Sequence, residues 1–236
     1  MPGYVVNEAS VDATVSDGGT VASKTTIDAS TGCGHLEQRV TRYAAGRSAP
    51  RSPGDRQEVM YVASGRGTIY LDGRPHEVDR DTGFYLAPGE TYEVENPGPD
   101  DLVIISTSAP PARSAEQPPE RRTVRYVDQQ PLPASPNREF RYLVTQEVGC
   151  LDVTQFVGTI PPGRAPDHSH TYDEVIYVVE GEGVLHIGQE TTPISTGTCI
   201  HLPPLLEHCL ENTGSTPMRV MGVFHPAGDP ASRANQ

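Results

Sequence analysis

The sequence has no tryptophan, a single lysine, and no apolar run that approaches the length of a membrane span. A transmembrane helix needs about 20 consecutive apolar residues, so we expect no association with a membrane. The only lysine, Lys24, lies near the N-terminus, which argues against Schiff-base chemistry. The opening stretch "MPGYVVNEASVDATV" has neither a basic start nor an apolar core, so we expect no secretory signal and a cytoplasmic location.

Basic residues are also scarce. Lysine and arginine together number 18 against 31 acidic residues, which gives a net charge of −13. An acidic surface without a basic stripe repels a phosphate backbone, so nucleic acid is not expected as a partner. The four cysteines form no CxxC pair, and in a chain of 236 residues we expect them to be reduced thiols in the core. Neither a GxSxG elbow nor a Walker loop is present in the sequence.

Glycine and proline are abundant, with 23 of each, while hydrophobic residues make up 35 % of the chain. No window shows a sustained helical period. Short runs of valine, isoleucine, leucine and tyrosine alternate with glycine and proline instead. Short strands at this close spacing predict an all-β fold, built as an antiparallel sandwich or barrel.

One part of the sequence is repeated. The segment "QEVMYVASGRGTIYLDG" from Gln57 matches "DEVIYVVEGEGVLHIGQ" from Asp173, and the two lie 116 positions apart. The same offset relates further prolines, asparagines and glycines over about fifty residues. A constant register over that length indicates a duplicated unit.

The repeat divides the chain into two units of ordinary domain size. We expect an N-terminal barrel with an N-terminal arm over residues 1–105, a linker rich in proline and alanine over 106–122, and a C-terminal barrel over 123–236. The stretches before Ser30 and from Arg122 to Gln146 look like equivalent lead-ins to the two units. The sequence leaves open whether these arms pair with the other domain or with a second subunit.

The stretch "PPGRAPDHSHTYDEVIYVVEGEG", which begins at Pro161, places two histidines and a glutamate within seven residues. Side chains two positions apart on an extended chain share a face, so His168 and His170 are expected to point the same way. Glu174 lies an even number of positions further on and converges with them if the chain turns back nearby. His208, which follows a Pro-Pro turn, supplies a third imidazole.

These two stretches resemble the two sequence motifs of the cupin superfamily; the matching residues are Gly163, His168, His170, Glu174, Gly181, Gly197, Pro203, His208 and Asn212. Leu205 stands where the second motif usually has glycine. Together with the repeat, the chain resembles a bicupin, two double-stranded β-helix (jelly-roll) barrels in tandem. The resemblance implies that one divalent transition metal is bound inside the C-terminal barrel by His168, His170, Glu174 and His208.

The implied ligand set combines three neutral imidazoles with one carboxylate. Such mixed nitrogen and oxygen donors suit Fe, Mn, Co, Ni or Zn and do not choose among them. Four protein ligands on an octahedral ion leave two positions for water, substrate or dioxygen, which is the open coordination that catalysis requires.

The N-terminal unit differs at the corresponding positions. At the offset of 116, Ser52, Gly54 and Tyr92 replace the three histidines, and only Glu58 remains, opposite Glu174. One carboxylate and one phenol do not hold a transition metal tightly, so this barrel is expected to be metal-free and to brace the other one. The alternative is an organic-ligand pocket that uses Glu58 and Tyr92.

The resemblance implies a metal-dependent enzyme acting on a small organic molecule. The ligand set is similar to that of quercetin-dioxygenase-like cupins, which makes a dioxygenase using O2 the leading hypothesis, with Glu174 as both metal ligand and general base. Two alternatives stay open. One is a redox-silent isomerase, decarboxylase, cyclase or lyase in which the metal acts as a Lewis acid. The other is a non-catalytic protein that binds a small molecule.

The residues expected to line the C-terminal barrel are apolar; they are Ile160, Ile176, Val178, Leu185, Leu202 and Leu210. An apolar lining favours an aromatic or polyketide-like ligand over a sugar. Two barrels in one chain resemble the dimer that single cupins form, so a monomer or a homodimer is expected.

Several polar residues near the motifs have weaker signals. His186 and His201 alternate with apolar neighbours, so we expect them to face away from the barrel core, at the surface or an interface. Tyr172 and Asp173 adjoin the implied ligands and are expected to be turn residues or to support the ligands from behind. Asn212 is expected to stabilise a turn at a strand end.

Overall fold

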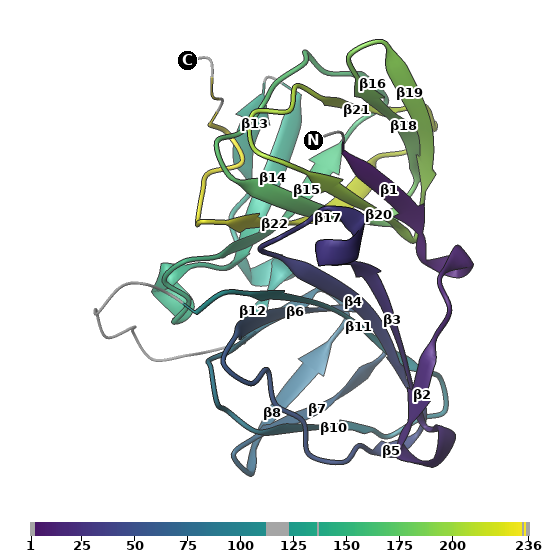
Figure 1. The fold of residues 1–236 in the computed structure, drawn as a ribbon, viewed down its shortest axis with the longest axis vertical. Coiled ribbons are helices and arrows are strands. Elements are labelled where there is room, and N and C mark those ends of the chain that lie inside the picture. The colour runs from purple at the N-terminus through teal and green to yellow at the C-terminus, as the bar shows by residue number, and fades with distance from the viewer. Residues whose placement is uncertain (1–2, 112–122, 136, 233, 235–236) are drawn as a thin grey trace.

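The computed structural model describes residues 3–111, 123–135, 137–232 and 234, and it consists almost entirely of strands (Figure 1). Five short 3-10 helices join some of them. The prediction of an all-β fold with two jelly-roll barrels is confirmed. Within the part of the chain that is described, no helix is long and apolar enough to span a bilayer.

The N-terminal barrel pairs a seven-stranded sheet, in the order β12-β9-β6-β11-β4-β3-β2, with a four-stranded sheet, in the order β5-β10-β7-β8. Its strands are β2 (Thr14–Ser16), β3 (Val21–Ile27), β4 (Glu37–Tyr43), β5 (Gly46–Arg47), β6 (Gln57–Ser64), β7 (Arg66–Leu71), β8 (Arg74–Asp79), β9 (Thr82–Leu86), β10 (Tyr92–Asn96), β11 (Leu102–Ala109) and β12 (Val124–Arg125). All its strand pairs are antiparallel.

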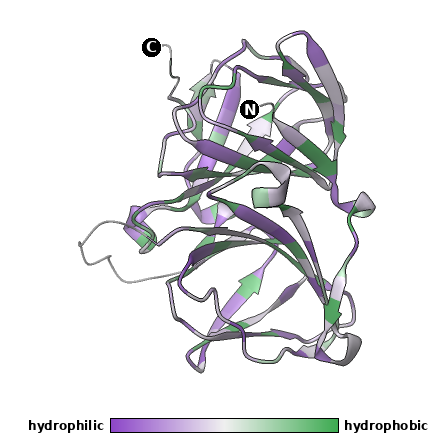
Figure 2. Ribbon diagram, in the orientation of Figure 1, coloured by the Kyte–Doolittle hydropathy of each residue, from purple (hydrophilic) through white to green (hydrophobic). Residues whose placement is uncertain are grey.

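The C-terminal barrel repeats this plan, with one sheet in the order β1-β20-β17-β22-β15-β14-β13 and another in the order β16-β21-β18-β19. Its strands are β1 (Tyr4–Asn7), β13 (Leu132–Ser135), β14 (Arg138–Val144), β15 (Thr154–Ile160), β16 (Gly163–Arg164), β17 (Asp173–Glu180), β18 (Glu182–Ile187), β19 (Glu190–Ser195), β20 (Thr198–Leu202), β21 (Cys209–Asn212) and β22 (Met218–His225). Hydrophobic and hydrophilic residues alternate along many of these strands, as a barrel with a buried inner face requires (Figure 2).

The lead-in segments exchange strands between the two barrels. Strand β1 pairs with β20 of the C-terminal barrel, and β12 pairs with β9 of the N-terminal barrel. In Figure 1 the purple β1 accordingly lies among the strands of the upper, C-terminal barrel. Each arm therefore protects an edge of the other domain's sheet, which answers the question that the sequence left open.

The segment between the barrels begins later than residue 106. Strand β11 continues to Ala109 and keeps its pairing with β6 up to that residue. Residues 112–122 of the expected linker lie outside the described residues. The N-terminal unit thus includes a few residues beyond 105, the expected end.

A large apolar core joins the two barrels. It includes Val59 and Ile105 from the N-terminal unit and Val175 and Val223 from the C-terminal unit, each no more than 1 % exposed. Complete burial of such a side chain contributes about 1.5–3 kcal/mol, so this interface fixes the barrels against each other. Each barrel also has its own inner core, and all six predicted lining residues lie in that of the C-terminal barrel.

Asparagine ends equivalent strands in the two halves in the same way. The Asn212 side chain donates to the carbonyl oxygens of Ile160 and Thr216, both at 2.8 Å, and accepts from the Gly214 amide. Asn96 makes the matching contacts in the first barrel. The expected turn-stabilising role of Asn212 is confirmed.

A glycine in each "GxG" corner lets two backbones approach closely. A Cβ atom at Gly183 would overlap the carbonyl oxygen of Glu211, and one at Gly67 would overlap that of Glu95. We expect Gly183→Ala to destabilise the protein by about 3 kcal/mol, because the obstruction is backbone and cannot rotate away. Denaturant unfolding measures this. Gly34→Ala is the matched control, since nothing lies within 4 Å of its Cβ position; equal losses for both variants would contradict the argument.

Candidate metal centre

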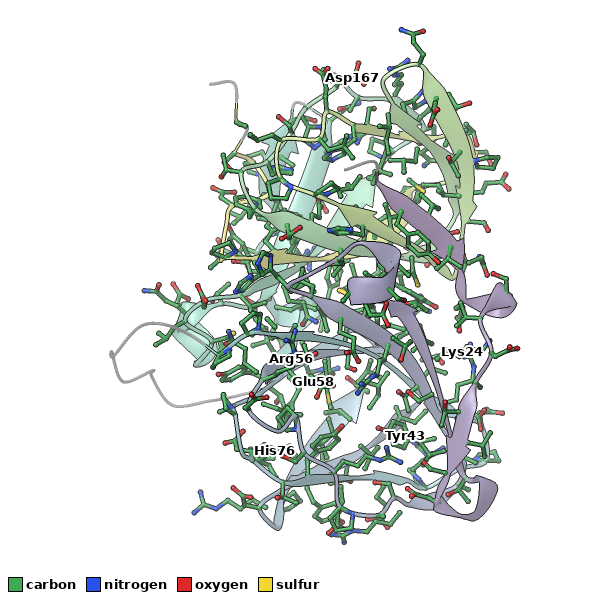
Figure 3. All side chains as sticks on the ribbon, in the orientation of Figure 1. Lys24, Tyr43, Arg56, Glu58, His76 and Asp167 are labelled. Atoms are coloured by element: carbon green, nitrogen blue, oxygen red, sulfur yellow. The ribbon has the colours of Figure 1, made fainter. Side chains whose placement is uncertain are left out.

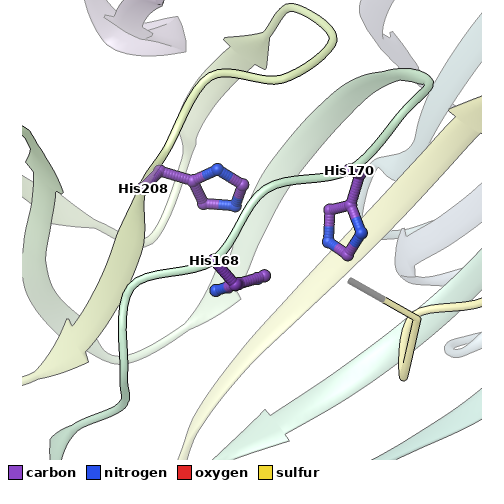
Figure 4. Close-up of side chains that lie close together, drawn as sticks. All are labelled: His168, His170 and His208. Carbon is purple, nitrogen blue, oxygen red and sulfur yellow. The ribbon is translucent and has the colours of Figure 1, made fainter. Parts of the chain in front are cut away.

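The three motif histidines converge inside the C-terminal barrel (Figure 4). Backbone hydrogen bonds of 2.9 Å in both directions join His168 to His208, which places a loop before β17 beside the start of β21. The ring centroid of His168 lies 4.5 Å from that of His208 and 5.0 Å from that of His170. One nitrogen from each ring lies within 4.8 Å of the others, a spacing at which three imidazoles can share one ion.

Glu174, the second residue of β17, joins this group. Its Oε2 lies 3.7 Å from Nε2 of His208 and 4.0 Å from Nε2 of His170. That oxygen is buried and has no hydrogen-bond partner among the described residues, and burial raises the pKa of Glu174 to about 8. A buried carboxylate oxygen that faces imidazoles without a proton donor suits a bound cation, which would restore its charged form. The four residues named from the sequence therefore meet in one place.

Neighbouring groups fix two of the histidine rings. His208 donates through Nδ1 to the carbonyl oxygen of Leu206 at 2.9 Å, which leaves the lone pair of Nε2 directed at the site. Tyr172 stacks on the His170 ring at 5.1 Å with an interplanar angle of 13°, and its hydroxyl donates to the carbonyl of Asp229 at 2.7 Å. Tyr172 is thus a positioning residue behind a ligand rather than a turn residue.

Leu205 forms the turn between β20 and His208 in a left-handed conformation, with φ of 65°. Its amide donates to the carbonyl oxygen of His170 at 2.7 Å, so the turn keeps the spacing of the histidines although the usual glycine is missing. The side chain is 66 % exposed. This residue therefore carries backbone strain without burying its apolar side chain.

We expect Leu205→Gly to stabilise the protein. A left-handed conformation costs a non-glycine residue about 1–2 kcal/mol, and the added chain entropy of glycine offsets about 0.5–1 kcal/mol of that relief. The net gain should be up to about 1 kcal/mol in the free energy of unfolding. Leu205→Ala removes the exposed side chain but keeps the strain, so a glycine variant no more stable than the alanine variant would contradict this account.

The histidines and Glu174 open into a cavity of about 90 Å³, and Arg138 of β14 forms part of its wall. Arg138 is half-buried and donates through Nη2 to the carbonyl oxygen of Leu210 at 2.7 Å. Burial lowers the pKa of its guanidinium, and no carboxylate among the described residues forms an ion pair with it. The cavity therefore combines a candidate metal centre with an arginine that forms no ion pair among the described residues.

Sequence reasoning missed Arg138. No motif contains it, and only the pairing of β14 with its neighbours brings it to the cavity. Arg164 and Arg219, by contrast, have acidic partners: Arg164 bonds Asp167 at 3.1 Å and Arg219 bonds Asp81 at 3.0 Å.

In the N-terminal barrel the correspondence with the histidines is shifted by one residue. Arg51, rather than Ser52, forms the bridge with Tyr92 that matches the bridge between the two histidines. Its guanidinium bonds Asp17 at 3.0 Å. Glu58 is buried inside the same barrel, where burial raises its pKa (Figure 3). The positive charge of Arg51 at this position opposes the binding of a metal ion. We therefore still predict that this barrel is metal-free.

His201 and Asp173 lie at the interface between the barrels. His201 is 2 % exposed, and its Nε2 lies 3.0 Å from Oδ1 of Asp173. Burial alone would lower the pKa of His201, but hydrogen bonds with Asp173 and Cys33 raise it to about 9. Asp173 opens β17 and is not a turn residue. His186 is half-buried and contacts Glu211 at 2.7 Å, consistent with its expected position outside the core.

All four cysteines are buried and free, as predicted. Cys33 and Cys150 take part in the interface between the barrels, whereas Cys209 lies next to His208 and contacts the carbonyl oxygen of Ala165.

Known structures share this arrangement of strands. The crystal structure of protein Ylba from E. coli superposes with a TM-score of 0.81 at 12 % identity, covering 94 % of this chain and 90 % of that one. A Bacillus subtilis oxalate decarboxylase structure, described with Mn(II) centres, superposes with a TM-score of 0.79 at 13 % identity, covering 95 % and 78 % of the two chains. The high TM-scores show a common fold, and at such low identities they show the fold alone.

Sequence relatives match shorter segments. An oxalate-binding protein from Thermotoga maritima is 33 % identical over 67 residues, which are 28 % of this chain and 55 % of that protein. The chain spans about half the length of the curated relatives it matches.

The family model of the cupin domain matches the chain twice, over residues 39–108 and 156–224. These segments contain the duplicated strands, and the second contains the three histidines and the glutamate. Together they cover more than half of the sequence, so the protein belongs to the cupin superfamily and is a bicupin.

Proposed function

We propose that this bicupin is a metal-dependent enzyme that acts on a small carboxylate. In this proposal His168, His170, Glu174 and His208 hold one divalent transition metal, and Arg138 binds the carboxylate of the substrate. The reaction would be redox-silent, a decarboxylation, isomerisation or lyase step.

The main support for this proposal is that the arginine and the proposed metal ligands line one cavity. Arg138 lines the same cavity of about 90 Å³ as the four residues proposed as ligands. A half-buried guanidinium without an acidic partner among the described residues can bind an anion, and its planar fork suits a carboxylate. A metal and an arginine on one small cavity together favour a substrate with one or two carboxylates.

The size of the cavity favours a small substrate. An apolar cavity of about 150 Å³ accommodates benzene, and this cavity measures about 90 Å³. It suits an acid of two to four carbons better than the aromatic or polyketide-like ligand expected from the apolar lining. The oxalate-binding relative and the fold shared with oxalate decarboxylase support the same substrate class.

Each group of residues that lines the cavity would have its own role in the reaction. Arg138 would bind and orient the substrate carboxylate through charge-assisted hydrogen bonds. Phe140, Phe156 and Phe224, which also line the cavity, would exclude water. Glu174 would hold the metal through Oε2, which faces the histidines, and would accept or return a substrate proton at Oε1. A divalent metal held by the histidines would supply Lewis-acid stabilisation of developing negative charge on the substrate.

The quercetin-dioxygenase-like reaction remains a separate prediction, because the same four ligands serve both chemistries. Oxygen uptake separates them. A redox-silent enzyme converts its substrate without consuming O2, whereas a dioxygenase consumes one O2 for each turnover.

The test is a substrate screen with purified protein loaded separately with Mn²⁺, Fe²⁺, Ni²⁺ and Zn²⁺. Each form is incubated with carboxylates of two to four carbons, with the matching uncharged amides, and with aromatic compounds. Substrate loss is followed by NMR and oxygen by electrode. We expect a carboxylate to be consumed without oxygen uptake while its amide is left intact. Turnover confined to aromatic compounds, with oxygen uptake, would favour the dioxygenase.

A further inference from the structure

A second group of metal-ligating side chains lies between the barrels, away from the cavity of the first. Cys33, Asp173 and His201 are 1 %, 7 % and 2 % exposed. One ligand atom from each, a thiol sulfur, a carboxylate oxygen and a ring nitrogen, lies within 4.8 Å of the other two. Each barrel contributes to the group, because Cys33 belongs to the N-terminal half and the others to the C-terminal half.

The chain holds each of these side chains in place. Cys33 follows Gly32, whose φ of 94° ends the 3-10 helix of Ala29–Thr31, and its amide donates to the carbonyl oxygen of Asp28 at 3.0 Å. Asp173 contacts His201 through Oδ1 at 3.0 Å, and its Oδ2 lies 2.9 Å from Nδ1 of His35. His35 therefore orients the carboxylate from outside the group, as residues behind metal ligands commonly do.

Adjacent residues of β17 separate this group from the first site. Successive side chains on a strand point to opposite faces. Glu174 accordingly faces the inside of the C-terminal barrel with His208, while Asp173 faces the interface with His201. The two groups share a strand and no ligand.

Because the chain is duplicated, each residue of this group has a counterpart with which it can be compared. Gln57 and Tyr85 of the N-terminal unit lie 116 positions before Asp173 and His201. Cys150 of the C-terminal unit follows Gly149 at the end of a 3-10 helix, as Cys33 follows Gly32, and is its counterpart at an offset of 117. The Cys150 thiol contacts Oε1 of Gln57 at 3.6 Å, so the counterparts of Cys33 and Asp173 meet as well. The two groups thus share the cysteine, but only the group of Cys33 combines it with a carboxylate and an imidazole.

We propose that Cys33, Asp173 and His201 bind a second divalent transition metal ion, with Zn²⁺ as the best match. One thiolate, one imidazole and one carboxylate form a donor set typical of tetrahedral zinc, with water as the fourth ligand. Because its ligands come from both halves, the ion links the barrels, and the free energy of metal binding adds to the stability of the interface.

Cobalt substitution tests the site in the full-length protein. A thiolate bound to Co²⁺ gives a ligand-to-metal charge-transfer band in the near ultraviolet, and the first site has no thiolate ligand. We expect metal-free protein titrated with Co²⁺ to show this band, and His208→Ala to keep it. Cys33→Ser should lose the band, whereas Cys150→Ser, the matched control from the other half, should retain it.

The outcomes are distinguishable from those for the first site. A band in the wild type that disappears in both Cys33→Ser and His201→Gln, with circular dichroism unchanged, supports the proposal. Absence of the band in the wild type, or its persistence in folded Cys33→Ser, overturns it. Thermal unfolding gives a second reading: Zn²⁺ should raise the melting temperature of His208→Ala, and equal metal responses in His208→Ala and in the double variant His208→Ala/Cys33→Ser also overturn the proposal.

Discussion

Replacing His208 by alanine should release the metal of the C-terminal barrel and abolish turnover. Structural zinc sites with four ligands are stabilised by about 10–16 kcal/mol, or about 3 kcal/mol for each ligand, which corresponds to a loss of about 100-fold in affinity when one ligand is removed. The effect on turnover should be larger, because the remaining ligands no longer fix the ion beside the substrate. The measurements are metal affinity by competition with a chelator and turnover at saturating metal.

The variant should still fold. The pairing of residue 208 with His168 uses backbone atoms only, and alanine keeps both hydrogen bonds. His186→Ala is the matched control, because that imidazole contacts Glu211 on the outer face of β18 and lies outside the cavity. Metal affinity that falls equally in both variants, or that is unchanged in His208→Ala, would contradict the assignment.

Replacing Arg138 by methionine should lower kcat/KM for a small carboxylate by about 10²–10³-fold. Removal of one partner from a buried, charge-assisted contact costs about 2–5 kcal/mol, and methionine preserves most of the apolar volume of the arginine stem. The metal content should be unchanged, because Arg138 is not among the proposed ligands. Steady-state kinetics with the carboxylate and with its amide measure the effect, which should be confined to the charged substrate.

Arg141→Met is the control for this experiment. Arg141 lies three positions further along β14 and points to the opposite face, where it donates to the carbonyl oxygen of Tyr126 at 3.1 Å. Its replacement should leave kcat/KM nearly unchanged. If Arg138→Met turns over the carboxylate as well as the wild type does, the proposed role of the guanidinium is wrong.

Much of the fold was predictable from the sequence because duplication leaves a pattern. The constant offset between the halves identified two similar units, and runs of β-branched residues between glycines indicated strands. The cupin motifs placed His168, His170, Glu174 and His208 together, since motif spacing reflects a local loop that returns to the same strand end.

Features that depend on long-range pairing were not predictable. The exchange of β1 and β12 joins segments far apart in the sequence. Neither segment has a sequence pattern that indicates the strand with which it pairs. Arg138 reaches the cavity through the register of β14, which a short polar sequence does not reveal. The one-residue shift that brings Arg51 opposite Tyr92 arises in a loop, where the constant offset of the strands no longer applies.

The interface between the barrels illustrates the same limit. His201 alternates with apolar residues, so the sequence correctly directed it away from the barrel core. Only the packing of the two units shows that this outer face is buried and that Cys33 and Asp173 meet His201 there.

The central claim is that a transition metal occupies the C-terminal barrel, and anomalous diffraction from crystals of the native protein tests it most directly. Data collected on both sides of the absorption edge of the metal identify the element and its position. We predict an anomalous peak enclosed by His168, His170, Glu174 and His208. A map that resolves the sulfur atoms of the methionines and cysteines but shows no peak among these four side chains would contradict it.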